Sequence, residues 1–177
     1  MMDEKAIPLM SVYEGWEGYQ QSLVSAIAPR KPAELAWRPA PSLKSVGELA
    51  EHISYGRIDW FNRMGAPGSR ELATEAQGWY PATEDAAELV RRLETSWQMV
   101  KDALSQWTVA DLSETYLQPY QGKTYAVSRQ WTIWRIMAHD IQHGGQLSIM
   151  LYTQGIDIPE LGDLGGHLTV PPFADVS

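Results

Sequence analysis

Three histidines, His52, His139 and His143, have the type and spacing that indicate metal chemistry. His139 and His143 are four positions apart, and at 3.6 residues per turn this spacing places both imidazoles on one face of a helix, one turn apart. Neutral imidazole suits zinc, nickel, copper and iron(II). Such pairs also occur by chance on solvent-facing helix surfaces, so the pair alone leaves both interpretations open.

His52 lies in a second predicted helix and supplies the missing third ligand from a facing element. Three protein ligands with one open position form the arrangement typical of catalytic zinc. The alternative is a buried histidine that is satisfied by a backbone or hydroxyl partner. The fourth histidine, His167, follows a Gly-Gly pair near the end of the chain, where we expect a surface residue that reaches the site only if the tail folds back.

Arg135 and Gln146 lie on the same helical stripe as His139, four residues before it and seven after it. Arg135 is a candidate for binding an anionic substrate or a cofactor carboxylate, and its alternative role is a surface salt bridge. Gln146 is a candidate hydrogen-bond partner for a metal ligand. Asp140 and Gln142 flank the histidines but are predicted to point elsewhere on the helix.

Asp59 is seven residues after His52 and is the remaining candidate for the site. Its carboxylate would orient a ligand or act as a base, whereas the alternative is a solvent-exposed side chain. No other residue indicates a catalytic role, so a metal-bound water or a thiol would carry the reaction.

The composition limits what this chemistry can be. The 177 residues contain no cysteine, which excludes disulfides, thiolate ligands and a cysteine nucleophile, so a metal needs nitrogen or oxygen ligands and any thiol must come from outside. The formal net charge of −8 argues against nucleic-acid binding. We recognise no signal peptide and no membrane-spanning apolar run, so the expected location is cytoplasmic, with no membrane partner.

Apolar residues at steps of three and four predict four long helices. They run from about Ile7 to Ala28, from a Ser45 cap to Met64, from a Thr83 cap to about Leu104, and from about Ser128 to Gly155. Ser45 and Glu48 form a capping-box pattern at the start of the second helix. The segments between the first three helices are rich in Pro and Gly, so residues 29–43 and 65–81 are predicted to be connections.

One domain over residues 1–177 accommodates these elements, with residues 156–177 as an irregular tail. Residues 112–127 break the helical pattern and predict a short irregular or β-hairpin excursion that turns at Gly122. The predicted fold class is therefore all-α, an antiparallel four-helix bundle with this excursion before the last helix. Bundles build metal sites from inward side chains on facing helices.

Three stretches of the sequence resemble the DinB/YfiT-like superfamily. The stretch Ser45-Val46-Gly47-Glu48-Leu49-Ala50-Glu51-His52-Ile53 resembles the start of that family's second helix, and Trp37-Arg38-Pro39 resembles the preceding loop. The stretch His139-Asp140-Ile141-Gln142-His143-Gly144-Gly145-Gln146-Leu147 resembles its second motif, a His-x-x-x-His followed by Gly-Gln. The resemblance extends over roughly Ala6 to Gly155.

This resemblance implies a four-helix bundle that holds a divalent metal ion, zinc or nickel, through His52, His139 and His143. Members with assigned activities include hydrolase-like metalloproteins and thiol-dependent S-transferases or isomerases. We therefore expect a metal-dependent enzyme that acts on a small molecule, as a low-molecular-weight-thiol S-transferase or a hydrolase. The alternative is a non-catalytic metal-containing binding or assembly protein linked to stress. A homodimer is a further possibility that no particular residue dictates.

Overall fold

A computed structural model describes residues 7–79, 81–158 and 161 of the chain. It contains the helices α1 Leu9–Val12, α2 Gly15–Ile27, α3 Pro32–Ala36, α4 Val46–Arg63, α5 Ser69–Ala76, α6 Ala86–Gln106 and α7 Arg129–Thr153. Two short 3-10 turns, Gln77–Trp79 and Val109–Ser113, and two strands, β1 Thr115–Tyr120 and β2 Lys123–Ser128, complete the described elements.

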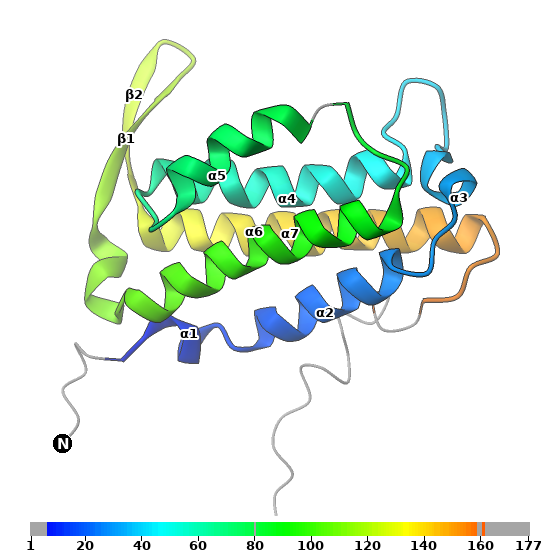
Figure 1. Ribbon diagram of the computed structural model, residues 1–177. Coiled ribbons are helices and arrows are strands. Elements are labelled where there is room, and N and C mark those ends of the chain that lie inside the picture. Colours follow the sequence, from blue (N-terminus) through cyan, green and yellow to red (C-terminus); the bar gives the residue numbers. More distant parts are fainter. Residues whose placement is uncertain (1–6, 80, 159–160, 162–177) are drawn as a thin grey trace, which may run out of the picture.

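The four longest helices, α2, α4, α6 and α7, lie side by side and enclose the core (Figure 1). Helix α4 packs against both α6 and α7, and α2 also packs against both of these helices. The protein is thus mostly helical with a hairpin before its last long helix, as predicted. The predicted count of four helices is not confirmed, since the described residues form seven α-helices.

Helices α4 and α6 begin at the same end of the molecule, so they run parallel (Figure 1). Gly47, at the start of α4, faces Thr83 just before α6, and Glu51 meets Arg92 of α6. The fully antiparallel arrangement that we predicted is therefore wrong for this pair. The reason is the connection 65–85, which carries the chain back along the bundle and contains α5.

A side-chain cap begins each of α4, α6 and α7, the three long helices that carry the predicted site and the residues that support it. The Ser45 hydroxyl accepts a hydrogen bond from the Glu48 backbone N–H, and the Glu48 carboxylate accepts one from the Ser45 N–H, which confirms the capping box. Ser128 caps α7. Asp85, rather than Thr83, caps α6, because its carboxylate accepts from the Ala87 N–H.

The two segments predicted as connections each contain a helix. Residues 32–36 form α3, and residues 69–76 form α5. Both helices are shorter than the window over which helical periodicity becomes recognisable, and each buries few side chains. Packing against α4 therefore stabilises two short helices that the sequence pattern alone does not reveal.

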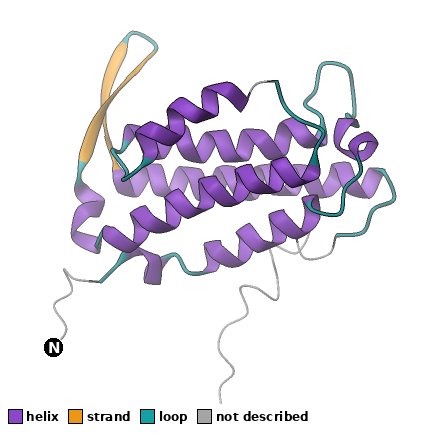
Figure 2. Ribbon diagram, in the orientation of Figure 1, coloured by secondary structure: helices purple, strands orange, loops and turns teal. Residues whose placement is uncertain are grey.

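The excursion before α7 is a β-hairpin, shown in orange in Figure 2. The register pairs Thr115 with Ser128 and Tyr120 with Lys123. Gln121 and Gly122 form the turn with φ values of 47° and 75°, the left-handed conformation that a tight hairpin requires. The predicted turn at Gly122 is confirmed.

Beyond α7, Gly155 adopts a φ of 77° and ends the helix as predicted. Ile158 and Leu161 are buried against the bundle. Residues 159–160 and 162–177 of the predicted tail, which include His167, lie outside the described residues. No helix in the described ranges has the length and apolar character needed to cross a membrane.

Candidate metal centre

The structure brings His52 of α4 together with His139 and His143 of α7. Ligand atoms from the three side chains all lie within 4.8 Å of one another. The Nε2 atoms of His52 and His139 are 3.2 Å apart. The ring centroids are 4.4 to 4.9 Å apart in all three pairs. Two helices that run in opposite directions thus present three imidazoles to one point.

This arrangement fits a single metal ion. Two imidazole nitrogens that share a tetrahedral zinc ion at about 2.0–2.1 Å lie roughly 3.3 Å apart, and the 3.2 Å between His52 and His139 matches that separation. A direct N–H···N hydrogen bond between two neutral rings has a similar length. The third ring adds a further ligand nitrogen within 4.8 Å of the other two, so the three side chains together could hold a metal ion.

Gly56 makes room for the His139 ring. A Cβ atom at position 56 would lie 2.7 Å from Cε1 and 3.2 Å from Nε2 of His139. Gly56 is one helical turn after His52, so the glycine and the ligand share one face of α4. The missing side chain lets the His139 imidazole lie against α4, next to the His52 ring.

Gln146 fixes the orientation of His143. Its Oε1 lies 2.6 Å from Nδ1 of His143, so Nδ1 carries the proton and donates it to the amide oxygen. That tautomer leaves the Nε2 lone pair of His143 free for a metal. The structure therefore places Gln146 in the supporting position that its spacing suggested.

The surroundings of His52 and His143 favour their neutral forms. Burial lowers the pKa of His52 from 6.5 to about 4, with smaller contributions from His139, His143 and Lys44. Burial also lowers the pKa of His143, against a raising effect of the hydrogen bond to Gln146. Neutral imidazoles are the form that coordinates metals, so both rings are ready to bind at neutral pH.

A buried ion pair lies directly behind His139. Asp140 and Arg57 have fully buried side chains, and Arg57 Nε donates to Asp140 Oδ2 at 2.8 Å. The indole N–H of Trp16 donates to the same oxygen at 2.9 Å. Arg57 also donates to the Gln20 side chain at 2.6 Å. The network joins α2, α4 and α7 beneath the histidines.

The buried polar atoms without partners in this region include one of His139 and one of Asp140. His139 Nδ1 and Asp140 Oδ1 are buried without a hydrogen bond from any described residue, and they are 3.7 Å apart. A metal on Nε2 of His139 requires a proton on Nδ1, and a carboxylate is the usual acceptor for such a proton. Asp140 is thus positioned to support His139, contrary to our expectation that it points away from the site.

The positions of Arg57 and Asp140 in the sequence are a signal for this ion pair. Arg57 is four residues after Ile53 and four before Phe61, both of which are fully buried core residues of α4. Asp140 likewise lies on the apolar stripe of its helix α7, between the buried Ile136 and Leu147. Opposite charges on the apolar stripes of two predicted helices favour a buried pair, because neither charge is tolerated alone.

A second charged network supports the His52 side of the site. Glu51, the residue before His52, accepts a hydrogen bond from Arg92 of α6 at 2.8 Å. Arg92 in turn donates to Glu88 at 2.8 Å. His52 and Glu51 line a cavity of about 420 Å³ together with Lys44 and residues 76–77. This cavity gives a small molecule a place beside His52.

Asp59 and Arg135 lie further along α4 and α7. Asp59 accepts a hydrogen bond from Arg63 at 2.7 Å and is partly exposed, with no described contact to the three histidines. Arg135 lies over the rings of Trp60 and Trp131. Both residues are therefore near the hairpin end of the two helices rather than among the imidazoles.

Comparisons with known proteins agree with this fold. The family model of the DinB superfamily matches residues 16–147, a range that includes all three histidines. A crystal structure of a DinB-like protein from Bacillus cereus ATCC 10987 superimposes with a TM-score of 0.66 at 18% sequence identity, over 82% of this chain and 92% of that chain. At this identity the likeness shows the fold. No curated protein sequence gives a significant match.

Proposed function

The chain belongs to the DinB superfamily, and from this membership we propose that it binds one divalent metal ion, zinc or nickel, through His52, His139 and His143. The observation that carries the proposal is the convergence of three ligand nitrogens within 4.8 Å, two of them 3.2 Å apart. Imidazole-only donor sets suit both metals.

We further propose that the metal centre is catalytic and acts on a small molecule. A bound ion would supply a Lewis acid and an open coordination position. The chain contributes three neutral ligands, which leave the positive charge of the ion uncompensated, and a cavity beside His52 that admits a substrate. The reaction class that these features favour is hydrolysis or S-transfer from a low-molecular-weight thiol. The absence of cysteine agrees with a thiol supplied from outside.

The chain's own residues would hold the site in position. Gln146 fixes the tautomer of His143, and Gly56 leaves the space in which the His139 ring lies. The ion pair of Arg57 and Asp140 holds the backbone of α7 beneath His139. Preorganised ligands of this kind keep the geometry that a metal requires.

Elemental analysis of untagged protein tests metal binding. We expect near-stoichiometric zinc or nickel in the parent and its loss in the double variant His139→Ala/His143→Ala. The exposed Gln142→Ala on the same helix is the control and should keep its metal. A parent that takes up neither ion after incubation with each would refute the proposal.

Activity is tested separately on the metal-loaded parent. Hydrolytic substrates and thiol-transfer substrates should give a rate that disappears in the double variant. Full metal occupancy with no rate on either class would instead favour the non-catalytic binding or assembly role.

A further inference from the structure

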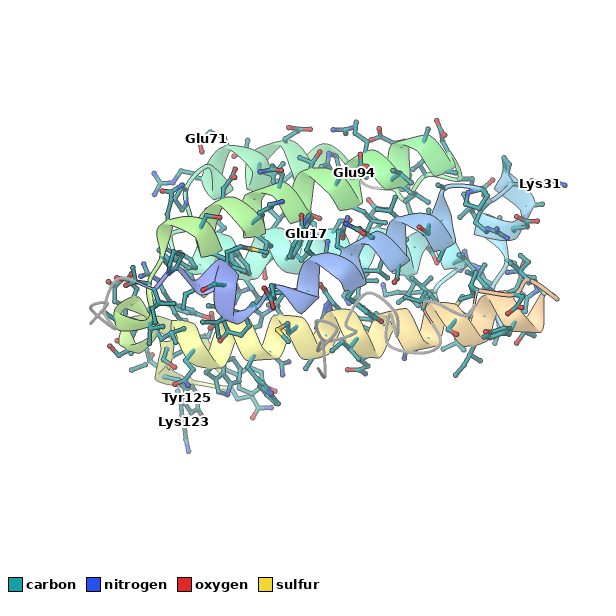
Figure 3. The ribbon with its side chains drawn as sticks, turned by 90° about the horizontal axis from the view of Figure 1, so that it is seen from below. Glu17, Lys31, Glu71, Glu94, Lys123 and Tyr125 are labelled. Carbon is teal, nitrogen blue, oxygen red and sulfur yellow. The ribbon has the colours of Figure 1, made fainter. Side chains whose placement is uncertain are left out.

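A second cavity, of about 760 Å³, lies where the hairpin meets α4 and α7. We call it the hairpin groove and define it by Trp60, Arg63, Gln118, Tyr125, Trp131 and Arg135, which line it. Figure 1 shows the hairpin standing beside the end of α4 and the start of α7. Figure 3 shows Tyr125 and Lys123 beyond the edge of the bundle. The volume is in the range of sites that bind small molecules.

The walls of the hairpin groove are attached to each other. Arg63 of α4 donates to the Gln118 side chain of β1 at 2.6 Å. The Tyr116 hydroxyl of β1 and the Thr132 hydroxyl of α7 are 2.9 Å apart. These contacts hold the hairpin to both helices, so the groove is preformed rather than opened by a ligand.

The two arginines of the groove have different partners. Arg63 is neutralised by Asp59, 2.7 Å away, and is engaged with Gln118. Arg135 has no ion pair or hydrogen bond with any residue in the described ranges, and its guanidinium lies 5.7 Å from the ring centroid of Trp60 and 5.5 Å from that of Trp131. A guanidinium that lies over aromatic rings and makes no hydrogen bond keeps its N–H donors available. Arg135 is therefore a positioned cation with unused donors.

We propose that the hairpin groove binds the carboxylate of a planar aromatic or conjugated small molecule. The carboxylate would accept two parallel hydrogen bonds from Arg135. The exposed rings of Trp131 and Tyr125 would pack against the planar part of the ligand. A polyanion such as a nucleic acid is disfavoured by the net charge of −8, whereas a ligand with a single carboxylate is not.

This site goes beyond the proposed function, because binding in the groove requires no metal. It lies close to the histidine cluster, since Arg135 is four residues before His139, a rise of roughly 6 Å along α7. A ligand anchored at Arg135 would thus bind about one helical turn from His139, in a groove that none of the three histidines lines. Its binding and the metal content of the protein are separately measurable.

The test is calorimetric titration with three probes: 2-naphthoate, its neutral amide 2-naphthamide, and the non-planar carboxylate cyclohexanecarboxylate. We expect the parent to bind 2-naphthoate at least about tenfold more tightly than either other probe. Arg135→Gln should weaken 2-naphthoate by about tenfold or more and leave 2-naphthamide unchanged. Arg70→Gln, which removes the same charge from an exposed position on α5, is the control and should bind like the parent.

The double variant His139→Ala/His143→Ala separates this proposal from the metal proposal, and it should bind 2-naphthoate like the parent. Equal binding of 2-naphthoate by Arg135→Gln and the parent would overturn the proposal, as would equal affinities for the acid and the amide. No binding of 2-naphthoate to the parent in the millimolar range would also overturn it. NMR gives a further readout, because the indole N–H signals of Trp60 and Trp131 should change their proton and nitrogen chemical shifts on binding. The variants Trp60→Phe and Trp131→Phe assign these signals.

Discussion

Gly56 and His139 are in direct contact, and a Cβ atom at position 56 would lie 2.7 Å from Cε1 of the imidazole. Real Cβ atoms essentially never approach another heavy atom so closely. Glycine in the middle of a helix normally costs stability, by about 0.5–1 kcal/mol relative to alanine. The position of the His139 ring therefore depends on a residue that the helix would otherwise disfavour.

Gly56→Ala should displace the His139 ring and weaken metal binding by about tenfold or more, the scale seen when residues that support metal ligands are changed. The helix itself gains from alanine, so we expect the metal-free protein to remain folded. The measurement is competition for zinc with a chromophoric chelator. A variant with parental zinc affinity would show that the contact does not position His139.

Gly145→Ala is the matched control for this substitution. Gly145 is also in a helix that carries ligands, but a Cβ there meets nothing within 4 Å. We expect parental zinc affinity and a rise of about 0.5–1 kcal/mol in the free energy of unfolding.

Gln146→Leu should also weaken zinc binding, by about tenfold to a hundredfold. The leucine removes the acceptor 2.6 Å from His143 Nδ1, so that the ring can rotate and exchange its tautomer. The same competition assay measures the effect. Gln142→Leu, an exposed change on the same helix, should leave the affinity unchanged, and equal losses in the two variants would contradict the role of Gln146.

The predicted parts of this fold are those with long-range periodicity or strong local signals. The capping box of Ser45 and Glu48, the hairpin turn at Gly122 and the left-handed Gly155 were each recognisable from residue type and spacing. Helix α5 was missed, and with it the parallel course of α4 and α6. Eight residues give too few repeats of the apolar pattern to identify a helix.

The three imidazoles were predictable from two signals: the helical spacing of His139 and His143, and the resemblance of the sequence around all three histidines to the motifs of the family. Their supports were predictable only in part. The i, i+3 relation of His143 to Gln146 is local, whereas the contact of Gly56 with His139 depends on how closely α4 and α7 approach. A helical wheel places Asp140 away from the histidines, because it shows the direction of a side chain but not what lies behind the helix.

Arg57→Met should lower the free energy of unfolding by about 3–5 kcal/mol, since it leaves the Asp140 carboxylate buried without its counter-charge. Denaturant unfolding of the metal-free protein measures this loss. Arg70→Met, at an exposed site, should change the stability by no more than about 0.5 kcal/mol.

The double variant Arg57→Met/Asp140→Leu extends the same measurement. It should lose less than the sum of the two single variants, because it removes both charges of the buried pair. Strictly additive losses would mean that Arg57 and Asp140 stabilise the bundle independently of each other.

Glu88→Gln should destabilise the protein in a manner that depends on pH. The Arg91 side chain, with help from Arg92, lowers the pKa of Glu88 from 4.5 to about 2. A depressed carboxyl pKa contributes stability that is complete above pH 4.5 and is lost as the pH falls toward 2. Because Glu88 is partly exposed, we expect a loss of about 1 kcal/mol or less at pH 7, diminished further by salt.

Chemical unfolding of Glu88→Gln and the parent at pH 7 and pH 2.5 measures this dependence, and the difference in stability should shrink at the lower pH. Glu94→Gln removes the same charge from an exposed position of α6 (Figure 3) and should differ little from the parent at either pH. Glu88 also holds Arg92, which in turn binds Glu51 next to His52. A loss in Glu88→Gln of the same size at both pH values would therefore indicate that Glu88 contributes through its contacts with Arg92 and not through its charge.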